Sequence, residues 1–150
     1  MKISIGADHA GFEMKQRVIQ ILQHLGHEVR DVGTESTESV DYPPYAFRVA
    51  EAVRDHVVDR GILLCDSGNG IAIAANKVEK IRATICINVT MAELARRHND
   101  SNVLVLAAKF TEPAALQPIV ETWLTTGFDG GRHERRIGQI TEYERTHQHQ

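Results

Sequence analysis

The chain has few of the residues that mark secreted or disulfide-stabilised proteins. It contains two cysteines, Cys65 and Cys86, in 150 residues, which is too few for a disulfide framework. No apolar run approaches the roughly 20 residues that span a bilayer. The strand-like segment that follows Met1 has no signal-peptide core before it. We therefore expect a cytoplasmic protein that does not enter a membrane.

An excess of one charge sign is also lacking. The net charge of -3 excludes a broad nucleic-acid surface, although it allows a local basic patch. Several histidines have no metal-ligand spacing, so we predict no metal site: His24, His27, His56, His147 and His149. The length and the hydrophobic content of 42% predict one domain over residues 1–150.

The hydrophobic pattern predicts strands that alternate with helices. Strands are expected at 2–6, 27–32, 61–64, 82–87 and 102–106. Helices are expected at 12–25, 45–55, 91–97, 113–125 and 133–147, with an alanine-rich one after residue 70. Thr90 is predicted to cap the helix at 91–97, with Glu93 completing a capping box. The loosest segments are expected near Thr37 and at 148–150. This alternation predicts the α/β class: a three-layer α/β/α Rossmann-like sandwich around a five-stranded parallel sheet.

The central motif is Cys65-Asp66-Ser67-Gly68-Asn69-Gly70, between a predicted strand and a predicted helix. Its small residues allow backbone N–H groups to converge on a phosphate or on an oxyanion formed in a reaction. The same positive field is expected to lower the pKa of the Cys65 thiol, whereas the Asp66 carboxylate opposes thiolate formation. The alternative is a structural turn with a cysteine that only fills space.

Other polar residues follow the predicted strands. Asp8 and His9 follow the first strand, and His98 and Asn99 lie between the fourth and fifth. Ligands bind such sheets at the carboxyl ends of the strands, so we expect these residues to converge with Cys65 on one edge. Asp8-His9 can supply an acid or base and a phosphate donor, or else a turn that caps the next helix.

A basic segment follows Gly130-Gly131. Arg132 and Arg136 are four residues apart, on one helix face, and suit a phosphate dianion. The alternatives are a solvated charged helix here and, for the run from Arg96 to Asn99, an exposed helix end that suits cations.

Together these segments resemble the ribose-5-phosphate isomerase B family, which includes related sugar-phosphate isomerases. Six blocks in the family's order span nearly the whole chain and are more specific together than any one alone. They are Gly6–Phe12, Asp41-Tyr42-Pro43, Cys65–Gly70, Ile73–Lys77, Arg97-His98-Asn99, and Gly131-Arg132-His133 with Arg136.

The resemblance implies an aldose–ketose isomerase that works through an enediol or enediolate without a metal or other cofactor. In the family, the position of Cys65 holds the base that moves a proton between C1 and C2, and that of Ser67 handles protons at the sugar oxygens. The positions of His98 and Asp8 serve ring opening. The loop amides hold the developing oxyanion; the residues concerned are Asp66, Gly68, Asn69 and Gly70.

The resemblance also implies a substrate site shared between subunits. The positions of His9, Arg132 and Arg136 bind the phosphate, while Tyr42 and Asn99 line the sugar site. Family members are homodimers, some of which pair into tetramers, and the C-terminal helix reaches the partner. His98, Asn99 and the two arginines then act in the neighbour's site.

This chain departs from the family pattern at three positions. Some relatives carry a catalytic glutamate after the Asn-Gly pair, but Ile71 stands there, so Cys65 is the base. Asp66 replaces a usual glycine, and Lys109 stands where arginine is frequent, with its role left open. The expected reaction is the conversion of ribose 5-phosphate to ribulose 5-phosphate. The alternatives are isomerisation of another sugar phosphate, such as allose 6-phosphate, galactose 6-phosphate or a tetrose phosphate, and a non-catalytic module that binds sugar phosphates or nucleotides.

Overall fold

The computed structural model describes residues 1–147, so the predicted loose segment at 148–150 lies outside it. Five parallel strands form one sheet, as predicted, and their order in the sheet is β2-β1-β3-β5-β4. The strands are β1 (Lys2–Ala7), β2 (Glu28–Asp31), β3 (Arg60–Cys65), β4 (Ala83–Ile85) and β5 (Val103–Ala107).

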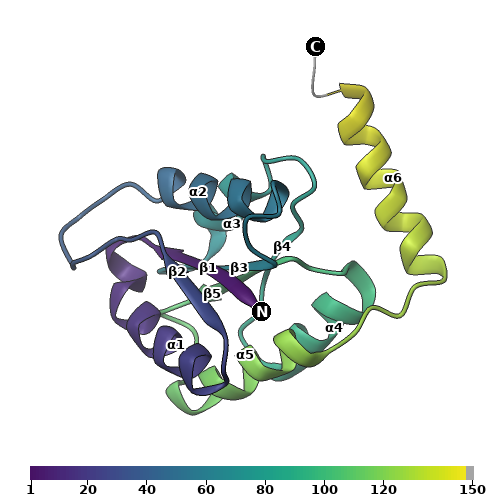
Figure 1. Ribbon diagram of the computed structural model, residues 1–150. Coiled ribbons are helices and arrows are strands. Elements are labelled where there is room, and N and C mark those ends of the chain that lie inside the picture. Colours follow the sequence, from purple (N-terminus) through teal and green to yellow (C-terminus); the bar gives the residue numbers. More distant parts are fainter. Residues whose placement is uncertain (148–150) are drawn as a thin grey trace.

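Helices connect the strands and cover both faces of the sheet (Figure 1). They are α1 (Phe12–His24), α2 (Pro43–Arg54), α3 (Asn69–Ala75), α4 (Val89–Asn99), α5 (Leu116–Thr125) and α6 (Arg132–His147), with short 3-10 turns η1 (His9–Gly11) and η2 (Pro113–Ala115). Helices α1, α4 and α5 lie on one face, and α2 and α3 lie on the other.

The strands carry apolar side chains toward both helix layers. In β3, Ile62 and Leu64 pack with α1, α4 and α5, whereas Leu63 and Cys65 pack with α2 and α3. A strand that is buried on both faces needs a continuous apolar run, which the sequence supplies. The three-layer α/β/α prediction is therefore confirmed.

Some predicted boundaries are wrong. The fourth strand is shorter than 82–87, and α2 begins at Pro43, where the fixed φ of proline suits the first helical turn. The cap of α4 is Asn88, whose Oδ1 accepts the Met91 N–H at 2.8 Å, so Thr90 lies inside the helix. Glu93 pairs with Arg97 instead of closing a capping box.

The last helix projects from the rest of the protein, and near its far end a Glu144 carboxylate oxygen accepts the Lys80 N–H at 2.9 Å. Gly130 and Gly131 both adopt positive φ, at +71° and +58°, which glycine tolerates best, and they turn the chain into α6. From there α6 projects beyond the body (Figure 1) and leaves Ile140 and Tyr143 exposed. Within residues 1–147, none of the helices combines the length and apolar character that a bilayer crossing requires.

Candidate active site

Cys65 is the last residue of β3, at the carboxyl edge of the sheet, and its side chain is 5% exposed. The chain then folds back, so that the Gly68 N–H donates to Cys65 Sγ at 3.2 Å. Gly68 has φ of +82°, and a Cβ there would lie 3.1 Å from Val105. A glycine is needed for this turn to lie over the sulfur.

The pKa of the Cys65 thiol is raised, so the expectation of a lowered pKa is wrong. Burial raises it most, and the backbone N–H groups of Ile71 and Gly68 only partly offset this effect. The nearby charges of Asp8 and Asp66 raise it further, which confirms that Asp66 opposes thiolate formation. The loop amides therefore act mainly to make a buried thiolate attainable.

The loop after Cys65 is held by its own hydrogen bonds. The Asn69 N–H donates to Ser67 Oγ at 3.2 Å, and the carbonyl of Asp66 accepts the Lys109 N–H at 3.0 Å. Since the Gly68 N–H is also engaged, two of the amides expected to face an oxyanion already have partners in the loop. The loop is thus preformed around the sulfur and tied to the end of β5.

Asp8 follows β1 and lies beside Cys65. Its backbone N–H donates to the Leu64 carbonyl at 3.2 Å, and its Oδ1 accepts from Ala10 and Gly11 at 3.0 and 3.2 Å. Asp8 therefore does cap the turn that follows, which was the structural alternative. A Cβ on Gly11 would lie 2.7 Å from the Leu64 carbonyl, so glycine lets this turn pack against the end of β3.

His9 extends from the same turn, and one of its ring nitrogens is already used. Its Nδ1 accepts the Val40 N–H at 3.1 Å. The neutral ring then carries its proton on Nε2, which leaves a donor for a ligand. This arrangement fits the expected role of His9 at a phosphate.

Tyr42 joins this group from the start of α2. A Cβ on Gly70 would lie 2.5 Å from Tyr42 Cζ, so the tyrosine ring rests directly on the loop. The structure thus brings together the loop and four of the predicted side chains at the carboxyl edge: Asp8, His9, Tyr42 and Cys65.

His98 and Asn99 do not join them, and the expectation that one edge holds all these residues is wrong. They are the last two residues of α4. The Asn99 carbonyl accepts from Nε of Arg82 at 2.8 Å, and Arg82 is the residue just before the start of β4. A crossover helix runs back along the sheet, so its last turn lies at the amino edge of parallel strands. Within one chain, His98 lies at the opposite edge from Cys65.

The basic C-terminal residues also gather around His98. The rings of His98 and His133 stack with centroids 4.2 Å apart and planes 9° from parallel. Arg132 and Arg136 are exposed on the same helix as His133. The pKa of His133 is lowered by partial burial and by the charges of His98, Arg132 and Arg136. The sequence placed His133 in a motif but gave no signal of this contact.

His98, Asp129 and His133 offer ligand atoms within 4.8 Å of one another. Two nearly parallel rings do not direct their nitrogens at a common point. The Asp129 carboxylate is also paired with Arg97 at 3.2 Å. The arrangement fits a packed imidazole pair better than an ion, and the absence of a metal stays a prediction.

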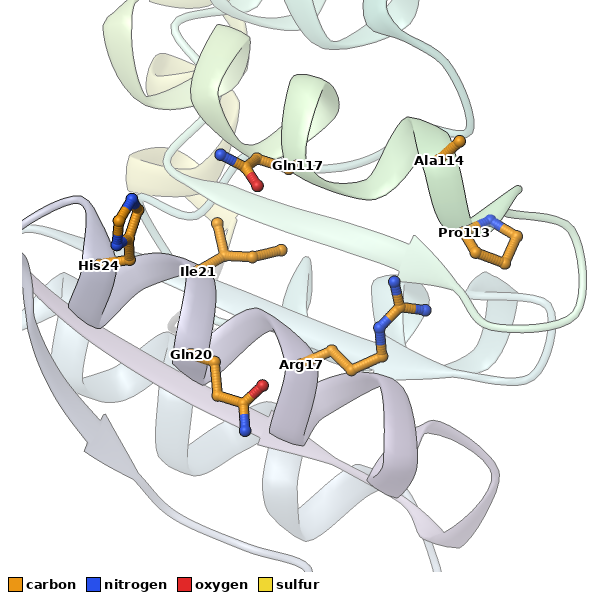
Figure 2. A pocket seen from close by; sticks show the side chains of 7 residues that line it. All are labelled: Arg17, Gln20, Ile21, His24, Pro113, Ala114 and Gln117. Atoms are coloured by element: carbon orange, nitrogen blue, oxygen red, sulfur yellow. The ribbon is translucent and has the colours of Figure 1, made fainter.

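The surface hollows of the chain do not coincide with the whole predicted site. One pocket between α1 and α5 contains none of the predicted residues (Figure 2); it is lined by Arg17, Gln20, Ile21, His24, Pro113, Ala114 and Gln117. A neighbouring pocket reaches Asp66 and Lys109. A substrate pocket whose wall is built from two chains would not be complete, or deep, at Cys65 in one chain alone.

Comparison with known proteins places the chain among sugar isomerases. The model of the Ribose/Galactose Isomerase family matches residues 3–140. Ribose-5-phosphate isomerase B of Escherichia coli is 46% identical over 143 residues, covering 95% of this chain and 96% of that protein.

Solved structures agree along the whole fold. Ribose-5-phosphate isomerase B of Clostridium thermocellum is 48% identical with a TM-score of 0.95, covering 97% of this chain and 99% of that one. The Mycoplasma genitalium enzyme, solved with bound ribulose 5-phosphate, is 37% identical with a TM-score of 0.91 and covers 96% of both chains. The fold, the motifs and these matches agree: this chain belongs to the Ribose/Galactose Isomerase family.

Proposed function

We propose that this protein interconverts ribose 5-phosphate and ribulose 5-phosphate. The observation that carries the proposal is Cys65, a buried thiol held by loop amides at the carboxyl edge of the sheet in a chain of this family. The relative solved with ribulose 5-phosphate supports this choice of sugar.

The reaction moves one hydrogen from C2 to C1 and shifts a carbonyl from C1 to C2. The Cys65 thiolate takes the C2 proton, which gives an enediolate with its charge on O1. Ser67 relays the O2 proton to O1, and the Cys65 thiol returns its proton to C1. Loop N–H groups other than those of Gly68 and Asn69, which are engaged within the loop, stabilise the charge on O1 as it develops. The Cys65 thiolate and the Ser67 hydroxyl are regenerated, the enediolate becomes the ketose, and the net charge does not change.

The raised pKa of Cys65 sets the pH dependence of this step. At neutral pH the thiol form dominates, because burial disfavours the thiolate. Turnover should therefore rise with pH through the neutral range. A thiol with a raised pKa gives a more basic thiolate, and a stronger base suits the removal of a weakly acidic C–H proton.

Ring opening must precede proton transfer, because the aldose exists mainly as a ring. We assign it to His98 of a second copy, with Asp8 beside Cys65 as its partner. Asn99, Arg132 and Arg136 come from that same copy, and His9 Nε2 donates to the phosphate from this one. No single chain has both halves, since His98 and Cys65 lie at opposite edges of the sheet.

Exposed apolar side chains mark the face that a second copy would cover. They come from α3, from α4 and the loop before it, and from α6: Ile73, Ile87, Val89, Met91, Leu94, Ile140 and Tyr143. Removing these apolar side chains from water in a homodimer would stabilise the association of the two copies. We infer a cytoplasmic homodimer, with a tetramer as a further assembly in which two dimers pair through a second contact.

The test is turnover of ribose 5-phosphate without added metal, in the native chain and in Cys65→Ala. We expect activity in the first, none in the second, and retained substrate binding in both. Cys86→Ala is a matched control, because this thiol is also buried, with its pKa raised to about 11 by burial, but packs with α4 and α5 on the other face of the sheet. Activity in Cys65→Ala would overturn the assignment of the base. Native protein that is inactive here but active on a hexose or tetrose phosphate would redirect the substrate, and binding without turnover of any would indicate a binding module.

A further inference from the structure

Helix α6 buries one side chain against the body, and near its other end a Glu144 carboxylate oxygen accepts the Lys80 N–H at 2.9 Å. Among the residues of α6 that the structure describes, His133 is buried, at 9% exposure, while the rest of the helix is exposed or partly so. Its ring stacks on that of His98 in the last turn of α4. The first turn of one helix therefore meets the last turn of another through two imidazoles.

The position of the His133 ring relative to the His98 ring is fixed by hydrogen bonds between the residues that precede the two histidines. The Asp129 N–H donates to the Arg97 carbonyl at 3.0 Å, and the Asp129 carboxylate accepts from Arg97 Nε at 3.2 and 3.3 Å. The His133 N–H then donates to the Gly130 carbonyl at 3.1 Å. Arg97, next to His98, is thus joined to the segment that leads into His133.

The stack sets the orientation of the His98 ring. A histidine used for proton transfer is usually oriented by a hydrogen bond from its other ring nitrogen to a carbonyl or carboxylate. Within residues 1–147, the contact that holds His98 is instead the flat face of His133. Both ring nitrogens of His98 therefore stay available at the edge of the stack.

We propose, on the basis of the function proposed above, that His133 is a positioning residue that holds the His98 ring in the orientation needed to open the cyclic sugar. It acts through His98 and does not touch the reacting atoms. The groups that face the pair are Arg97, Asp129, Arg132 and Arg136. Burial and the charges of His98, Arg132 and Arg136 lower the pKa of His133, and the Asp129 carboxylate only partly opposes this, so the ring is neutral near pH 7 and the stack does not join two cations.

The two directions of the reaction separate this role from a merely structural one. Ribose 5-phosphate must be opened before its C2 proton can be removed. Ribulose 5-phosphate is already open, because its C5 oxygen carries the phosphate and cannot close a five-membered ring on C2. Turnover from the ketose therefore needs proton transfer but no ring opening, and the aldehyde it releases closes in solution.

The experiment compares kcat and KM in both directions for native protein, His133→Ala and His133→Phe. We expect His133→Ala to lose about tenfold or more of kcat from ribose 5-phosphate, because small misplacements of a reacting group are costly, with ketose kinetics nearly unchanged. KM for ribose 5-phosphate should fall in parallel, since the equilibrium constant fixes the ratio of kcat/KM in the two directions. His133→Phe keeps a flat ring and should restore most of the loss. Arg135→Ala, an exposed neighbour on α6, is the control and should match the native protein.

An equal loss in both directions, with KM raised for both sugars, would overturn the proposal, since His133 would then only place α6 and its arginines. Unchanged turnover in both directions would overturn it as well. If His133→Ala does not fold, His133→Phe against His133→Leu decides, because leucine keeps bulk but lacks a flat face. Native protein without activity on either sugar would refute the proposed function instead.

Discussion

The loop at Cys65–Gly70 and helix α6 contribute to the proposed site in two different ways. Cys65 is almost wholly buried, and its loop is held to β3 and β5 by backbone hydrogen bonds. Helix α6 projects from the body (Figure 1). It buries one side chain and exposes both candidate phosphate-binding arginines. The fold of one chain completes the proton-transfer half, whereas the half that opens the ring and holds the phosphate depends on a neighbour.

Arg136→Ala should give the largest effect on the α6 half. A phosphate dianion held by two arginines loses a charge-assisted contact, so we expect KM for ribose 5-phosphate to rise about 100-fold. The catalytic rate at saturation should change much less. Steady-state kinetics test this, and a fall in kcat alone would show that the arginine is misassigned.

In the loop around Cys65, Gly68→Ala should lower the catalytic rate next most strongly. The added Cβ meets Val105 at 3.1 Å, in a conformation that favours glycine. The loop must shift away from the sulfur, and we expect about a tenfold lower kcat. Gly138→Ala, on α6 with open space around it, is the matched control. Equal kinetics for the two variants would contradict the role of the loop.

Asp66→Asn should have a smaller effect, in the opposite direction. Removing this carboxylate removes one cause of the raised pKa of Cys65, so the rising limb of kcat/KM should move to lower pH. Turnover near pH 7 should then increase modestly. A pH–rate profile tests this, and a limb that stays in place would mean that Asp66 does not act on the thiol.

Acid should weaken the contact between α6 and α4 slightly. The pKa of His133 is lower when docked than its ordinary value of about 6.5, so protonation favours the released form. Docking is undiminished above that value and weakens as pH falls below it. Amide hydrogen exchange along α6, corrected for intrinsic rates, should rise in native protein but not in His133→Phe. An identical pH response in both would contradict this account.

Local patterns predicted much of the fold. The apolar runs of β1, β3 and β5 gave the buried parallel sheet, and Gly68 and Gly70 marked the turn after Cys65. These features depend on residues close together in the chain. The motif at 65–70 is therefore visible in the sequence, and the structure places it at the carboxyl edge of β3.

Other features depend on contacts that local patterns do not contain. The rise in the pKa of Cys65 comes from burial by the whole fold, which outweighs the local N–H groups. The placement of His98 follows from the direction of α4, and its stack with His133 joins segments 35 residues apart in number. The ion pair between Lys15 of α1 and Asp31 at the end of β2, at 2.7 Å, is likewise a contact that no motif indicated.

The central claim is that one site combines Cys65 of one chain with His98 of another. Cys65→Ala and His98→Ala proteins, each with little turnover alone, should be mixed and allowed to exchange subunits. Random pairing makes half of the dimers mixed, and each mixed dimer regains one native site, so we predict recovery of about a quarter of native turnover of ribose 5-phosphate. Subunit exchange without any recovery would contradict the shared site.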